Sequence, residues 1–109
     1  MATTIKVLSQ TKPTAASLTD SYTVPALTTT VLSSLIVCNQ SAVATSFRIS
    51  IAVAGLADTP KQYIYYDVPI AGNDTFIATI GVTLGAGDIV RVYNTLATLS
   101  FNFYGQENT

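Results

Sequence analysis

The chain alternates apolar and polar residues with a period of two over short runs, and this pattern limits its fold more than any other feature. In "SFRISIAV", one face carries Phe47, Ile49, Ile51 and Val53. Successive side chains of a strand point to opposite sides, so this alternation predicts a strand with one buried face. "DIVRVY" and "LSFNFY" alternate in the same way, and no segment shows the 3.6-residue period of an amphipathic helix.

Turn-forming residues separate about eight such runs at a spacing typical of sandwiches and barrels. All 4 prolines fall at strand ends or in connections, where a missing N–H does no harm. The predicted strands lie near residues 4–8, 20–24, 31–38, 45–53, 62–68, 75–80, 88–94 and 98–104. We therefore predict an all-β fold, a single antiparallel β-sandwich that is jelly-roll-like or a small barrel, with helix content close to nil.

One predicted strand departs from simple alternation. The run "VLSSLIVC" fits a strand covered on both faces, and it ends in Cys38, which we interpret as a small buried hydrophobic residue. A single cysteine excludes an internal disulfide and a cysteine-built zinc site.

The length of 109 residues fits one domain, residues 1–109. Within it, 1–19 is predicted to be an N-terminal arm with the first strand, and 9–19 is the most linker-like segment. Residues 105–109 are predicted to be a flexible or interfacial tail. The sequence has no apolar run of the length that a secretory signal or a membrane span requires, so we expect synthesis in the cytoplasm and no membrane partner.

Charged residues make up only 10% of the chain, against about 25% in an average domain. The net charge of −1 supplies no basic stripe for a phosphate backbone, so we expect no nucleic-acid partner. A surface with so few charges suits a free monomer poorly, which indicates that other subunits cover part of it.

The glycine-rich segment "IGVTLGAGDIVRVY" raises the question of a phosphate site. A phosphate loop leads into a helix N-terminus, usually with a lysine, whereas a strand pattern without lysine follows here. We therefore predict that Gly81, Gly85 and Gly87 permit positive φ and a tight reversal, and that Asp88 accepts local amide hydrogen bonds. No cofactor and no small-molecule substrate are expected.

The sequence also argues against catalysis. It has no histidine, the commonest general base. Asp20, Asp58, Asp74 and Asp88 stand in turn-like contexts, where we predict that they cap turns. A glycosidase-like pair of Asp67 with Asp74 remains an alternative from sequence, and no calcium-loop rhythm is present. We expect no enzyme, no catalytic residue and no metal.

Two features indicate an interaction surface instead. The segment "QYIYYDV" places Tyr63, Tyr65 and Asp67 on one strand face, opposite Tyr66. Tyrosine is enriched at interfaces, so Tyr63, Tyr65 and Tyr66 are candidate interface residues, joined by tyrosines 93 and 104.

Arg48 and Arg91 are the second feature, because each stands in mid-strand among apolar neighbours. Such an arginine needs a carboxylate partner. Asp67 or Asp88 of the same chain is favoured, and a carboxylate across a subunit boundary or a bound ligand are the alternatives.

Three long segments carry a family resemblance: "YTVPALTTTVLSSLIVCNQSAVATSFRISIAVAG", "QYIYYDVPIAGNDTFIATIGVTLGAGDIVRVY" and "LSFNFYGQE". Together they resemble small virion structural proteins of tailed bacteriophages and prophages, from Ser21 to Glu107. The shared features are a Y-T-V-P opening, an S-S-x-x-V-C-N strand, an F-R-[IV]-x-[IV]-A-V strand, a Y-[LI]-Y-Y-D segment and a closing F-x-x-[FY]-G-x-E.

The resemblance implies a β-sandwich component of the virion without catalytic residues. The expected function is that of a capsid decoration (cement) protein on the capsid surface, with the major capsid protein and itself, as a homotrimer, as partners. A tail, baseplate or fibre protein is the alternative. A carbohydrate-binding module that uses tyrosines 63, 65 or 66 is the alternative from another class.

Overall fold

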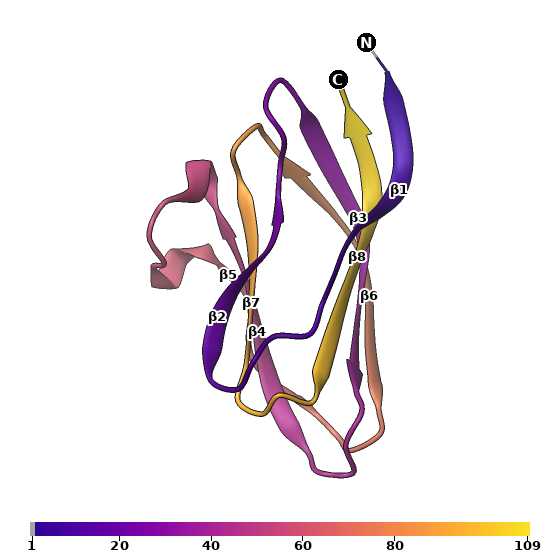
Figure 1. Ribbon diagram of the computed structural model, residues 1–109, viewed down its shortest axis with the longest axis vertical. Helices are drawn as coiled ribbons and strands as arrows, with labels where there is room; N and C mark the ends of the chain where they lie inside the picture. The colour runs from indigo at the N-terminus through magenta and orange to yellow at the C-terminus, as the bar shows by residue number, and fades with distance from the viewer. Residues whose placement is uncertain (1) are drawn as a thin grey trace.

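Eight strands form two four-stranded sheets in the computed structural model, which describes residues 2–109 (Figure 1). Two short 3-10 turns, η1 (Val53–Gly55) and η2 (Pro60–Gln62), lie in the connection between the fourth and fifth strands. The predicted all-β sandwich is confirmed. The strands are β1 (Thr3–Thr11), β2 (Ser17–Thr23), β3 (Thr29–Asn39), β4 (Thr45–Ala52), β5 (Tyr63–Ile70), β6 (Thr75–Leu84), β7 (Ile89–Asn94) and β8 (Leu99–Asn108).

The strand order identifies the sandwich as a jelly roll. The first sheet has the order β1-β8-β3-β6 and the second has the order β2-β7-β4-β5. Strands from the two halves of the chain pair in a nested way, β1 with β8, β2 with β7, β3 with β6 and β4 with β5, and each pair is antiparallel. This nesting is the jelly-roll arrangement of eight strands in two sheets, and Figure 1 shows the two sheets as separate layers.

The core lies between the layers, where the inward residues of both sheets meet. The rings of Phe47 in β4 and Phe101 in β8 pack edge to face, with centroids 6.0 Å apart. Alternation therefore directs the large apolar side chains into one core. The largest fully buried apolar side chains are Phe47, Phe101, Phe103, Leu32, Leu35, Ile49, Leu99, Val24, Val37, Val90 and Val92.

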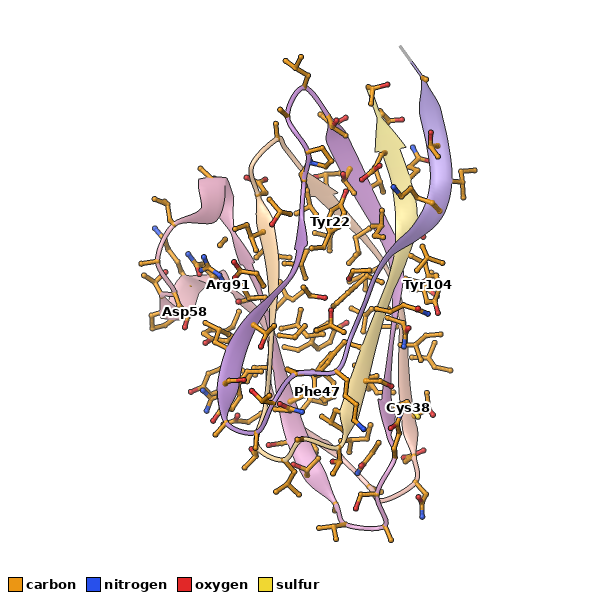
Figure 2. The ribbon with its side chains drawn as sticks, viewed as in Figure 1. Tyr22, Cys38, Phe47, Asp58, Arg91 and Tyr104 are labelled. Carbon is orange, nitrogen blue, oxygen red and sulfur yellow. The ribbon has the colours of Figure 1, made fainter. Side chains whose placement is uncertain are left out.

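Strand β3 has only one covered face, so the prediction of two covered faces is wrong. Leu35 and Val37 are fully buried, whereas Ile36 and Cys38 are only half-buried. Cys38 thus lies outside the core, contrary to the prediction, and Figure 2 shows it on the side of the first sheet that faces away from the second. The part "LIVC" is continuously apolar because its outward residues, Ile36 and Cys38, are apolar too, although no other layer formed by residues 2–109 covers them.

Within residues 2–109, both terminal segments are more ordered than the sequence predicts. Strand β8 continues to Asn108, where it pairs with β1 and β3, and Ala2 and Thr109 exchange backbone hydrogen bonds of 3.0 and 2.8 Å. Residues 105–108 are therefore part of a sheet and not a flexible tail, while an interfacial role of this segment stays a prediction. Strand β1 likewise extends to Thr11, so most of the linker-like segment 9–19 belongs to β1 and β2.

The glycine-rich segment forms the turn between β6 and β7, as predicted. The N–H of Asp88 donates to the Gly85 carbonyl at 3.1 Å, and Asp88 Oδ2 accepts from the Gly85 N–H at 2.8 Å. Gly87 has a φ of +85°, so it supplies the left-handed conformation that this turn needs. Gly81 lies within β6 and plays no part in the turn.

Candidate interaction surfaces

Two irregularities in the pairing of β5 with β4 decide how the tyrosines are distributed between the two sides of the second sheet, and the first is a β-bulge. Phe47 pairs with Val68 and Ile49 pairs with Tyr65, so two residues of β5 stand opposite the single residue between them on β4. One of the two, Asp67, has a φ of +51°, a conformation that aspartate adopts more readily than most residues. The bulge shifts the alternation by one residue from that point on.

A second register shift lies between Tyr63 and Tyr65, which pair with the adjacent residues Ser50 and Ile49 of β4. Tyr65 therefore does not share a face with Tyr63, and the sequence prediction is wrong here. The Tyr65 ring packs toward the core, with centroids 6.3 Å from Phe47 and 5.4 Å from Phe76. Tyr63 and Tyr66, predicted on opposite faces, instead meet edge to face at 5.1 Å.

Arg48 lies at the centre of the outward cluster. Its Nε and Nη2 donate to the two carboxylate oxygens of Asp67, at 2.6 and 3.3 Å. Its guanidinium carbon lies 4.2 Å from the ring centroid of Tyr66 and 5.0 Å from that of Tyr93. These hydrogen bonds to Asp67 raise the pKa of Arg48 above its ordinary value. The predicted pairing of Arg48 with Asp67 within the chain is confirmed.

A pocket of about 550 Å³ opens beside this cluster. Its lining residues are Arg48, Asp58, Thr59, Pro60, Tyr63 and Tyr66. The Tyr63 hydroxyl donates to Asp58 Oδ2 at 2.6 Å, and this hydrogen bond, with burial adding to it, raises the pKa of Tyr63. Asp58 thus lines the pocket and is hydrogen-bonded to Tyr63, whereas its turn-like sequence context predicted only a turn cap.

The β4–β5 connection that forms one wall of the pocket is anchored to the second sheet. Arg91 donates to the carbonyls of Leu56 and Gly55 at 2.7 and 3.2 Å, and to Asp20 Oδ1 at 2.9 Å. Asp88 Oδ1 accepts the Ala54 N–H at 2.9 Å. Figure 2 shows the connection, with Arg91 and Asp58, projecting from the second sheet.

Arg91 is therefore a supporting residue, and its partner differs from the prediction. It pairs with Asp20 rather than Asp67 or Asp88, because Asp20 lies within β2 directly opposite Arg91 and not in a turn. Asp74 does cap a turn, since its Oδ1 accepts the Thr75 N–H at 2.8 Å.

The outward side of the first sheet is different in character, and we call it the uncharged face. The four strands of this sheet contain only two charged residues, Lys6 and Glu107, which form an ion pair of 3.1 Å. Every outward residue is apolar or neutral, and Ile5 and Ile77 are 83% and 66% exposed. By alternation and register, the face comprises Thr3, Ile5, Val7, Gln10, Thr29, Val31, Ser33, Ser34, Ile36, Cys38, Thr75, Ile77, Thr79, Gly81, Thr83, Ser100, Asn102, Tyr104, Gln106 and Asn108.

Glu107 points toward the other sheet, which removes its charge from the uncharged face. Its Oε2 accepts the hydroxyl of the buried Tyr22 at 2.5 Å, and that hydroxyl also lies 2.9 Å from Thr30 Oγ1. Burial, followed by the Glu107 hydrogen bond, raises the pKa of Tyr22 to about 12, and the same bond lowers the pKa of Glu107. Sequence reasoning missed this link because it joins residues 85 positions apart.

No protein-family model matches the chain, and the search of curated proteins gives no match. Within residues 2–109, no three His, Cys, Asp or Glu side chains gather into a group that could hold a metal ion. The described part of the chain also has no helix that is long and apolar enough to cross a bilayer.

Proposed function

We propose that this protein is a structural component of a tailed-phage virion, and that it decorates the capsid by binding the major capsid protein through its uncharged face. The observation that carries the proposal is the absence of charged side chains from the whole outward side of the first sheet, together with the exposure of Ile5 and Ile77. The family resemblance of the sequence supplies the identity of the partner.

The uncharged face suits a permanent contact for an electrostatic reason. Burial of an unpaired charge in an interface costs several kcal/mol, so stable interfaces exclude charges from their centres. A partner surface can cover this sheet without desolvating an unpaired ion, because Lys6, which lines the same hollow as Ile5 and Tyr104, is paired with Glu107. Neutral side chains such as Asn102, Tyr104 and Gln106 still offer hydrogen bonds that set the orientation of the partner.

Decoration would stabilise the shell through multivalency. Each copy bridges neighbouring shell subunits, and association into a trimer raises the effective concentration of each further contact. The shell then resists the pressure of packed DNA because several contacts must break together. A homotrimer of the isolated chain is expected to sediment as such at tens of micromolar, and a single-chain species would count against a trimer that is stable in solution.

The proposal is tested by adding the purified protein to emptied mature shells and measuring saturable binding and the melting temperature of the shell. Ile77→Lys places a charge in the uncharged face, and we expect it to weaken binding at least 10-fold, in line with about 1.4 kcal/mol per factor of ten. Leu56→Lys is the matched control, because Leu56 is 61% exposed but lies on the side of the second sheet.

The results separate the proposal from its alternatives. Unchanged binding of the Ile77→Lys protein, or loss of binding by Leu56→Lys alone, would contradict the use of the uncharged face. Failure of the wild-type protein to bind shells, with recovery of the protein from tails in few copies, would support a tail, baseplate or fibre role instead.

A further inference from the structure

The pocket beside Arg48 has the walls of a small-ligand site. The rings of Tyr63 and Tyr66 stand at 85° to one another, so they form a corner of two apolar surfaces. Tyr66 is 58% exposed, which leaves most of its side chain open to solvent. The volume of about 550 Å³ lies within the range of known ligand pockets, roughly 300 to 1,000 Å³.

Polar groups also line the same pocket. Asp58 uses Oδ2 to accept the Tyr63 hydroxyl, so Oδ1 remains for a ligand hydroxyl, and the Thr59 side chain lies beside it. An apolar corner with hydrogen-bonding groups in the same pocket matches a pyranose, which has an apolar face of C–H groups and a rim of hydroxyls.

The wall is also held in place before any ligand binds. Gln62 accepts the Thr59 N–H at 3.4 Å through its side chain and donates to the Ala57 carbonyl at 3.0 Å. Arg91 and Asp88 anchor the earlier part of the same connection. A preformed wall reduces the ordering cost of binding, which matters most for a small ligand.

The charges of the site select among saccharides. The positive charge of Arg48 is matched by the bidentate contact with Asp67, while Asp58 adds a further carboxylate at the pocket. The sum of the three charges is −1, so an anionic sugar would meet net repulsion. We infer that the pocket formed by Tyr63, Tyr66 and the Asp58–Pro60 segment binds a neutral saccharide. This activity is separate from shell binding, because the pocket lies on the second sheet.

The test is an NMR titration of the full-length protein with methyl glycosides of glucose, galactose, mannose and N-acetylglucosamine, and with their β- and α-linked disaccharides. An open pocket and a small ligand predict a Kd on the order of 1 mM. We expect amide shifts confined to residues 58–66 and their neighbours in β4. Absence of shifts with every neutral saccharide, or shifts located elsewhere, would overturn the inference.

Two variants and two controls sharpen the result. Tyr66→Ala and Asp58→Ala should each weaken binding at least 10-fold, whereas Tyr66→Phe should retain it, because the ring and not the hydroxyl provides the wall. Tyr104→Ala, on the uncharged face, should bind as the wild type does. Tighter binding of sialyllactose than of lactose would contradict the assignment to neutral sugars, and loss of shell binding by Tyr66→Ala would contradict the separation of the two activities.

Discussion

The outward sides of the two sheets differ in their charged residues, although both belong to the same sandwich. On the second sheet, Arg48 pairs with Asp67 and Arg91 pairs with Asp20, and Arg91 also holds the β4–β5 connection. On the first sheet, the outward residues are neutral, and Ile5 and Ile77 project into solvent. Charged groups thus support the structure on one side and are missing from the other.

This difference separates residues that maintain the fold from residues that are free to contact a partner. A substitution of Arg91 leaves backbone carbonyls without their donor, so it acts on stability. A substitution of Ile77 on the uncharged face removes no internal hydrogen bond, so it acts on association. The predictions below test this separation, beginning with the largest effect.

Gly105→Ala should destabilise the protein by more than about 3 kcal/mol, because overpacking against fixed backbone is costly. A Cβ at this position would lie 2.0 Å from the Val31 carbonyl oxygen of the neighbouring strand. Gly81→Ala is the control in the same sheet, since a Cβ there meets nothing within 4 Å. Urea unfolding measures both variants, and equal midpoints would show that the first sheet is not closely packed at β8.

The Tyr22 hydroxyl, which links the two sheets, predicts a loss of stability at alkaline pH. The pKa of Tyr22 is raised from 10.0 to about 12, so its contribution is complete below pH 10 and is lost as pH rises through about 12. Two pKa units correspond to about 3 kcal/mol. Relative to Tyr22→Phe, the wild type should lose that amount over this pH range in denaturant titrations. A constant difference between the two proteins would contradict the buried link.

Glu107 predicts the opposite dependence on the acid side. Its pKa is lowered by the Tyr22 hydrogen bond, so its contribution is present above the ordinary pKa of glutamate and is lost as pH falls through the lowered value. In Glu107→Gln, the free energy of unfolding should therefore fall less steeply with decreasing pH in the acid range than it does in the wild type.

The two arginines of the second sheet should differ in their importance for stability. Arg91→Ala should cost about 2 kcal/mol, because the Arg91 side chain is only 12% exposed and serves two carbonyls. Arg48→Ala should cost about 1 kcal/mol or less, since its pair with Asp67 is more exposed. Thermal unfolding of both variants decides this, and the reverse order would contradict the assignment of Arg91 as the support of the connection.

Ile77→Lys should change the free energy of unfolding by less than about 0.5 kcal/mol, as is usual for surface substitutions. A larger loss of stability would mean that Ile77 helps to maintain the fold. Weaker shell binding by this variant would then not show that the uncharged face contacts the shell.

The fold was predictable because alternation and turn chemistry agree over most of the chain. The inward positions of Phe47 and Phe101 follow directly from counting by two, and the "LGAGD" turn follows from its glycines. Counting failed where a strand has an irregularity. Tyr63 and Tyr65 lie on different sides, and Tyr66 lies on the side of Asp67, because the pairing of β5 with β4 shifts register at both places. No local pattern in "YIYYDV" predicts these shifts.

The candidate site was predictable in its residue types more than in its geometry. Arg48, Tyr63 and Tyr66 do lie together, as candidates for a shared surface. Asp58 joins them through a connection whose path depends on contacts with β7, which are long-range and leave no sequence signal. The uncharged face could not be predicted from the sequence for a similar reason, since only the order β1-β8-β3-β6 brings its four strands together.

The most direct test of adhesion through the uncharged face is a cryo-EM map of the whole virion at a resolution that traces strands. The account predicts density for this chain on the outside of the capsid, with the β1-β8-β3-β6 sheet against the major capsid protein and the β2-β7-β4-β5 sheet toward solvent. Density confined to the tail, or a capsid contact made through the second sheet, would contradict it.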